Sequence, residues 1–185
     1  MTEHNIADAR DRMAKAATAL GHEFAGVRTG RASGSIFEKI TVDYYGVTTP
    51  LLQIAGVSSP EPQLLVISPY DKSAMGAIEK AILASDLGLN PSNDGTVIRV
   101  PFPPLTEERR KELAKLCKQY AEDARVAVRN IRRDTNDFFK HQEKEHDISQ
   151  DDLHRLEADV QKTTDGYITE IDEMLKRKEQ EIMEV

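Results

Sequence analysis

The chain is organised around residues 106–144, a stretch of 39 residues that contains neither Gly nor Pro. Its apolar or small residues recur in steps of three and four, at Leu113, Leu116, Tyr120, Ala124, Ala127, Ile131 and Phe138, with an interruption at Thr135. Such spacing is typical of a helix that packs one face against other helices. At about 1.5 Å per residue the helix would be roughly 58 Å long. A rod of that length requires partner helices on its apolar side.

Two further stretches carry a similar stripe. Residues 2–27 place apolar or small side chains at Ile6, Ala9, Met13, Ala16, Leu20, Phe24 and Val27. A third stripe consists of Leu153, Leu156, Val160, Thr163, Tyr167, Ile171, Met174 and Ile182. Thr106 is a predicted N-cap of the second helix, and Ser149 with Asp152 resembles a capping box before the third. Three such helices predict a three-helix bundle.

The middle of the chain has a different pattern. Between residues 30 and 104, short runs rich in β-branched and aromatic residues predict strands at 36–45, 51–55, 64–68 and 96–100. One helix is predicted over 72–87, with Asp71 as N-cap and Gly88 just beyond its end. A turn is predicted at Asn93, Asp94 and Gly95. This segment therefore reads as a small mixed β/α/β domain.

The boundaries of this segment carry residues that interrupt helices and strands. Gly30 ends the first apolar stripe, and Pro103 and Pro104 precede the long helix. We therefore predict an α+β protein in which residues 1–29 and 105–185 form one discontinuous bundle domain and residues 30–104 are an insert. The connectors, at about 29–31 and 101–105, form a predicted hinge, because two adjacent linkers restrict twisting but permit bending.

Composition narrows the class of protein. Charged residues make up 31% and aromatic residues 5% of the chain, a balance that suits long helices with narrow apolar stripes. Cys117 is the only cysteine, which excludes an intramolecular disulfide and gives no support to an oxidising compartment. No apolar run approaches the ~20 residues that span a membrane, and the charged start lacks a signal-peptide core. A cytoplasmic protein is expected.

The formal net charge of −7 is unevenly distributed. Residues 105–144 carry 11 Lys or Arg against 8 Asp or Glu, whereas residues 145–185 carry 5 against 13. At about 100° per residue, a second stripe on the long helix lies nearly opposite the predicted apolar one. It consists of Lys111, Lys118, Arg125, Arg129, Arg132 and Lys140. An acidic protein can thus present a local basic surface.

A row of cations on a helix is most often a solvated face, and that reading stays open for each of them. The alternative is a phosphate-binding surface, because the guanidinium groups at 125, 129, 132 and 133 can pair bidentately with phosphate. Arg28 and Arg31 could extend it. Helix-borne Arg without strand aromatics suits the backbone and shape of folded RNA better than its base sequence.

Motifs of catalysis are absent from the sequence. It has no phosphate-binding loop, no His-Glu-x-x-His pair, no Cys pair for zinc and no Gly-x-Ser-x-Gly elbow. None of the neighbouring histidines His141, His146 and His154 has the i,i+4 spacing of a helical metal-ligand pair. We therefore expect no enzyme activity, cofactor or metal.

Five stretches, which lie in both predicted domains, carry a resemblance to a known family. They are Arg28-Thr-Gly-Arg-Ala-Ser33, Val42-Asp-Tyr-Tyr-Gly46, Ala84-Ser-Asp-Leu-Gly-Leu-Asn-Pro91, Arg99-Val-Pro-Phe-Pro-Pro-Leu-Thr-Glu-Glu-Arg-Arg110 and Ala124-Arg-Val-Ala-Val-Arg-Asn-Ile-Arg-Arg-Asp134. At these residues the chain resembles the ribosome recycling factor family, and the resemblance covers essentially the whole chain. The resemblance implies a long three-helix bundle with an inserted β/α/β domain in an L-shaped molecule. A departure from the family pattern is the pair Phe138 and Phe139, which suggests lineage-specific packing.

The resemblance also implies a function. A member binds the 50S subunit of the post-termination 70S ribosome and, with elongation factor G and GTP hydrolysis, promotes its dissociation and the release of mRNA and tRNA. Its bundle lies against 23S rRNA, and Arg132 matches a position critical for ribosome binding. We predict an rRNA-binding set of Arg132, Arg129, Arg133, Arg125, Arg28, Arg31 and Lys118, and a hinge at Gly30, Pro103 and Pro104. The chain is expected to act as a monomer without a membrane partner.

One alternative from another class stays open. A helical scaffold or chaperone-like module would use the apolar stripes to bind proteins. The two functions differ in salt dependence, because phosphate contacts release counterions and weaken steeply as salt rises.

Overall fold

The computed structural model describes residues 6–184, which form two compact units. One unit comprises residues 6–24 and 115–179, and the other comprises residues 25–114 and 180–184. Each unit is discontinuous in sequence. The domain boundaries at about 29–31 and 101–105, and a hinge there, stay a prediction.

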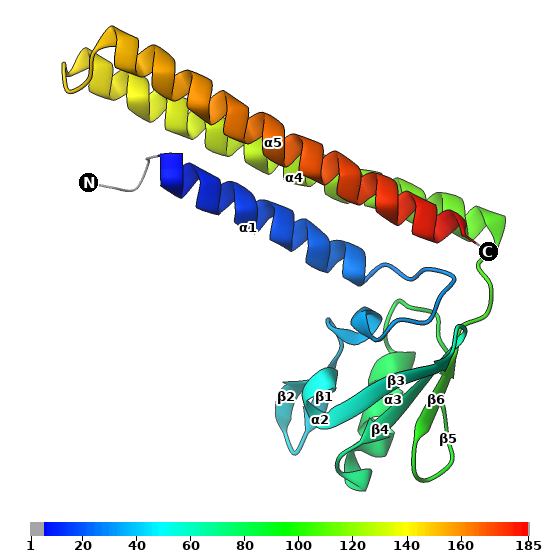
Figure 1. The fold of residues 1–185 in the computed structure, drawn as a ribbon. Coiled ribbons are helices and arrows are strands. Elements are labelled where there is room, and N and C mark those ends of the chain that lie inside the picture. The colour runs from blue at the N-terminus through cyan, green and yellow to red at the C-terminus, as the bar shows by residue number, and fades with distance from the viewer. Residues whose placement is uncertain (1–5, 185) are drawn as a thin grey trace. The chain divides into compact units, whose positions relative to one another are not determined.

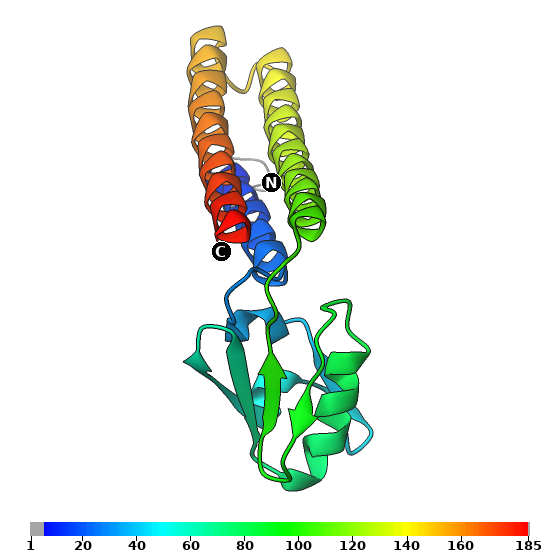
Figure 2. The same cartoon turned by 90° about the vertical axis from the view of Figure 1, so that its right-hand side faces the viewer.

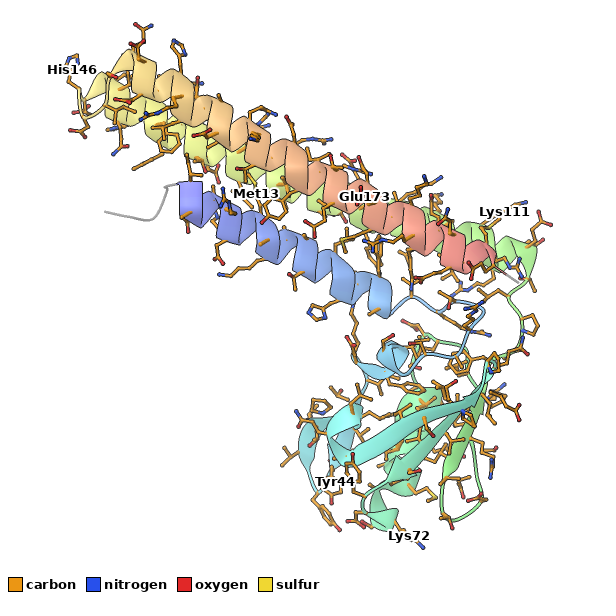
Figure 3. The ribbon with its side chains drawn as sticks, in the orientation of Figure 1. Met13, Tyr44, Lys72, Lys111, His146 and Glu173 are labelled. Atoms are coloured by element: carbon orange, nitrogen blue, oxygen red, sulfur yellow. The ribbon has the colours of Figure 1, made fainter. Side chains whose placement is uncertain are left out.

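The first unit is built from the greater part of three long helices: α1 (Ile6–Ala25), α4 (Glu107–Lys144) and α5 (Gln150–Met183). They lie side by side, and α4 runs antiparallel to both α1 and α5 (Figures 1 and 2). Met13, labelled in Figure 3, is completely buried. The predicted N-caps are confirmed, since Thr106 Oγ1 accepts from the amide of Arg109 at 3.2 Å and Ser149 Oγ accepts from that of Asp152 at 3.1 Å.

The apolar stripe of α4 differs from the predicted one. Its buried positions in the bundle are Cys117, Ala121, Ala124, Val128, Ile131, Thr135 and Phe139. Leu116, predicted to face the core, is 36% exposed, whereas Cys117 is completely buried. Thr135 can belong to the stripe because its buried hydroxyl donates to the carbonyl of Ile131 at 2.8 Å and is thereby satisfied. The predicted stripe was therefore rotated around the helix.

The second unit contains two antiparallel sheets. A hairpin pairs β1 (Thr41–Tyr44) with β2 (Val47–Pro50). A four-stranded sheet has the order β3-β4-β6-β5 and is formed by β3 (Ala55–Glu61), β4 (Leu64–Pro69), β6 (Ile98–Pro101) and β5 (Ser92–Asn93). Short helical turns η1 (Gly34–Phe37), α2 (Leu51–Ile54) and η2 (Lys72–Ala74) and helix α3 (Met75–Leu83) complete the unit.

Three predictions for this unit were wrong. The strand predicted over 36–45 begins only at Thr41, because the preceding residues form η1, which buries Ile36 and Phe37. Residues 51–55 were predicted as a strand, but α2 occupies most of them because Leu51 and Ile54, three residues apart, are both buried on one side of a helical turn. The helix predicted to reach residue 87 ends at Leu83, where the Ser85 hydroxyl donates to the carbonyl of Ile82 at 2.6 Å. Gly88 does adopt a left-handed φ of +62°, but five residues beyond the helix.

The core of the second unit joins the sheet to α3. Leu65, Ile67 and Ile98 come from β4 and β6, and Ile78 and Ile82 come from α3, and all are at most 1% exposed. The hairpin is tied to the start of η2, since the hydroxyls of Tyr44 and Tyr45 donate to Asp71 Oδ2 at 3.0 and 3.1 Å. Within residues 6–184, no helix is both long enough and apolar enough to cross a lipid bilayer.

Candidate nucleic-acid interface

The basic stripe of α4 flanks the buried stripe and does not oppose it. Taking about 100° per residue, Lys118, Arg125 and Arg132 lie roughly 55–95° from the centre of the buried positions. The other three cations of the stripe, Lys111, Arg129 and Lys140, lie roughly 110–135° from it. This prediction was wrong because it was measured from a stripe rotated away from the real one. Four of the six cations, Lys118, Arg125, Arg132 and Lys140, therefore have a partner on α5.

The cations on α4 and acids on α5 share one antiparallel register. Lys118 Nζ lies 3.5 Å from Glu179 Oε1, and Arg125 Nη2 lies 2.6 Å from Asp172 Oδ1. A step of seven residues forward on α4 thus matches a step of seven back on α5. Further along, Lys140 Nζ lies 3.6 Å from Glu157 Oε1 in the same register. Such flanking ion pairs accompany helix packing in coiled coils.

Arg125 is the most enclosed of these cations, with its side chain 19% exposed. It also contacts Glu122 Oε2 at 3.0 Å. Burial of the guanidinium lowers its pKa, but the hydrogen bonds to Asp172 and Glu122 outweigh that effect and raise it. Two carboxylates thus compensate one positive charge.

Arg129 shares Glu122 with Arg125. Its Nη1 lies 2.9 Å from Glu122 Oε1, and its side chain is 43% exposed. The hydrogen bond from Arg125 and then the one from Arg129 lower the pKa of Glu122, so this carboxylate stays charged between two guanidinium groups.

Arg132 has a different partner. Its Nη1 donates to Oε1 of Gln161 at 2.9 Å, and Nε2 of Gln161 donates to Asp165 Oδ1 at 2.7 Å. Within the described chain, no carboxylate forms an ion pair with Arg132. The guanidinium is held in place while its charge stays uncompensated.

Arg133 is exposed, and none of the hydrogen bonds or ion pairs among residues 6–184 involves its side chain. Arg132 and Arg133 are therefore adjacent cations of different accessibility, one half-buried and one exposed, in the same turn of α4. Of the predicted residues in this unit, these two are the ones best able to meet an external anion.

Arg28 and Arg31 belong to the second unit. The Arg28 guanidinium lies 5.6 Å from the centre of the Phe102 ring and donates to the carbonyl of Pro103. Burial, and then the positive charge of Arg109, lower the pKa of Arg28. Arg31 is 80% exposed and lies 3.7 Å from Glu184.

The predicted hinge residues also lie in this unit. Pro103 and Pro104 are exposed, and the preceding Phe102 is buried with its amide donating to Gln63 O at 2.8 Å. A Cβ added at Gly30 would lie 3.4 Å from the carbonyl oxygen of Glu184. Gly30 thus borders a close backbone approach, and its role as a hinge stays a prediction.

The sequence interpretation missed three residues that decide the charge of this surface: Glu122, Gln161 and Asp172. A usable signal was present, because cations at 118, 125 and 132 and acids at 165, 172 and 179 both recur every seven residues. Among residues 6–184, no group of three or more His, Cys, Asp or Glu side chains could hold a metal ion.

Comparison with known protein families places the chain beside the ribosome recycling factors. The model of the ribosome recycling factor family matches residues 20–183. The ribosome-recycling factor of Geobacillus kaustophilus (strain HTA426) is 58% identical over all 185 residues, and that of Bacillus mycoides (strain KBAB4) is 57% identical, in both cases with the full length of each chain covered.

Solved structures agree with this match. A solution structure of the ribosome recycling factor has a TM-score of 0.78 at 46% identity, covering 96% of this chain and 94% of the other. A second structure describes the T. thermophilus ribosome recycling factor and the E. coli elongation factor G bound to the E. coli post-termination complex. Its matching chain has a TM-score of 0.68 at 49% identity, with 96% of each chain covered.

Proposed function

Because the chain belongs to the ribosome recycling factor family, we propose that it binds the post-termination 70S ribosome through the 23S rRNA of the 50S subunit. With elongation factor G and GTP, it then promotes dissociation into subunits and release of mRNA and tRNA. The chain is a cytoplasmic translation factor that acts as a monomer and is not itself an enzyme. Its solved relative bound to a post-termination complex supports this proposal.

The observation that supports RNA binding is that Arg132 is held by a neutral amide, that of Gln161. A guanidinium that is oriented by an amide and has no carboxylate partner retains the charge needed to attract a phosphate. The adjacent exposed Arg133 adds a second cation. We place the anchor on these two residues, with Arg125, Arg129 and Lys118 as weaker contributors because acids already compensate them.

The proposed mechanism is mechanical. The bundle stays anchored on rRNA while elongation factor G displaces the inserted domain or its connectors. Gly30, Pro103 and Pro104 are the proposed bending points, and the bundle transmits the displacement to contacts between the subunits.

The test is sedimentation of post-termination ribosomes with elongation factor G and GTP, with and without this protein. We expect a loss of 70S particles and a gain of 50S and 30S particles only when all components are present. Elongation factor G with GTP alone is the matched control. Unchanged 70S particles in the complete mixture would refute the proposed function.

A further inference from the structure

The register between α4 and α5 gives Lys118, Arg125 and Lys140 an acidic neighbour on α5, and Arg132 is where that pattern changes. Seven residues after Arg125 on α4 comes Arg132, and seven residues before Asp172 on α5 comes Asp165. By the spacing of the Lys118 and Arg125 pairs, Asp165 should neutralise Arg132. The described ion pairs include the first two contacts but not this third one.

Gln161 takes the place of that ion pair. It lies one helical turn before Asp165, with its amide between Arg132 and Asp165. The amide oxygen accepts a hydrogen bond from Arg132 at 2.9 Å, and the amide nitrogen donates one to Asp165 at 2.7 Å. From this geometry we infer that Gln161 is a positioning residue, which holds the Arg132 guanidinium ready for an RNA phosphate without neutralising it. The inference rests on the proposed function, because it assumes that Arg132 contacts rRNA.

Asp165 has a separate part in this arrangement. A carboxylate accepts hydrogen bonds and cannot donate them, so it selects the Gln161 orientation in which Nε2 faces Asp165. The carbonyl end of the amide then faces Arg132. If the amide were reversed, two donors would meet at Arg132 and the contact would be lost. Asp165 therefore fixes the orientation of the amide that positions the arginine.

Arg125 and Arg132 have different kinds of partner on α5, which supports different roles for the two arginines. Both arginines are reached by a side chain from α5 at hydrogen-bond distance, but one partner is Asp172 and the other is a neutral amide. A carboxylate partner must be displaced before a phosphate gains the full charge of the guanidinium. An amide partner imposes no such competition.

The test measures binding to 50S subunits at several salt concentrations for wild type, Gln161→Glu, Gln161→Ala and Arg132→Ala. Glu, Ala and Gln all favour helices, so the bundle should stay folded, and circular dichroism checks this. Gln150→Glu is the matched control. It adds the same charge to α5 about 16 Å away along the helix, beyond the ~10 Å Debye length at 0.1 M salt.

We expect Gln161→Glu to bind about threefold more weakly, with the slope of log K against log salt reduced by about 0.9, the value for one phosphate contact. Gln161→Ala should also bind more weakly and lose part of the slope, because the register then allows Asp165 to pair directly with Arg132. Gln150→Glu should match wild type. A residue with a purely structural role would change thermal stability but not the slope.

Two failures can be told apart. If Arg132→Ala binds like wild type, the proposed anchor is wrong. If Arg132→Ala binds at least about tenfold more weakly but Gln161→Glu keeps wild-type affinity and slope, the positioning role of Gln161 is refuted and the proposed function stands.

Discussion

Arg125 on α4 donates from Nε and Nη2 to the same oxygen of Asp172 on α5, at 2.9 and 2.6 Å. This contact joins two helices and also neutralises a positive charge on the surface that we propose binds rRNA. The strength of the bundle and the affinity for RNA are therefore opposed at this position.

Replacing Asp172 should shift that balance. In Asp172→Asn, Arg125 keeps only Glu122 as a carboxylate partner, so we expect binding to 50S subunits about 2- to 5-fold tighter at low salt, as the loss of a competing ion pair allows. The free energy of unfolding should fall by about 1 kcal/mol or less. Salt-dependent binding and thermal unfolding measure the two effects.

The neighbouring Glu173 provides the control for this variant. It is exposed on α5 (Figure 3), and its side chain forms no ion pair among residues 6–184. Glu173→Gln removes one negative charge at nearly the same place without releasing Arg125. Equal gains in affinity for both variants would mean that overall charge, and not the contact with Arg125, controls binding.

A pair of alanines on α4 tests the position of the buried stripe. Ala121 is completely buried, whereas Ala127 borders a groove of about 360 Å³ between α1 and α4. Ala121→Leu should lower the free energy of unfolding by about 1–3 kcal/mol through overpacking. Ala127→Leu should change it by about 0.5 kcal/mol or less, because the longer side chain has room. Chemical denaturation measures both, and the reverse order would contradict the observed stripe.

These alanines show what the sequence could and could not predict. Helix α4 was predicted to within one residue at its start, because Thr106 caps it and no Gly or Pro interrupts it. The face it buries was predicted less well, since Cys117 and Thr135 are buried while Leu116 is half-exposed. Hydrophobicity alone ranks Leu above Cys and Thr. Packing favours the small residues because they let two helices approach closely.

For the candidate site, the sequence alone likewise could not predict how the charged side chains pair. The sequence identified Arg132 through its family, and Lys118, Arg125 and Arg129 through their spacing. It did not show which cations already have partners, because a partner such as Asp172 lies 47 residues away and is fixed by the register of two helices. The distinction between Arg125 and Arg132 therefore required the structure.

Asp71 gives the second unit a predicted pH dependence. The backbone amide and then the hydroxyl of Ser73, followed by the Tyr44 hydroxyl, lower the pKa of Asp71 to about 2. The pKa of an unfolded Asp is about 3.9. The charged carboxylate therefore stabilises the fold above about pH 4, and this contribution disappears as the pH falls through about 2. The stability gap between wild type and Asp71→Asn should be largest at pH 6 and should close by about pH 2.

Thermal unfolding midpoints between pH 2 and pH 7 measure this gap. Asp86→Asn is the control, because Asp86 is exposed and its side chain has no hydrogen-bond partner among the described residues. The control should give a difference from wild type that barely changes with pH. A gap for Asp71→Asn that stays constant from pH 6 to pH 2 would show that the carboxylate charge is not what holds the hairpin to η2.

The salt dependence of ribosome binding distinguishes an RNA-binding protein from a protein-binding scaffold. Its slope also gives the number of cations that contact phosphates. Each phosphate contact adds about 0.9 to the slope of log K against log salt. If Arg132 and Arg133 are the main contacts of the bundle, the double variant Arg132→Ala/Arg133→Ala should lose about 1.8 of that slope. Lys118→Ala/Arg129→Ala removes the same charge from cations that Glu179 and Glu122 already compensate, so its loss should be well under half as large. Equal losses would contradict the selective role of the first pair, and a wild-type slope near zero would favour the scaffold.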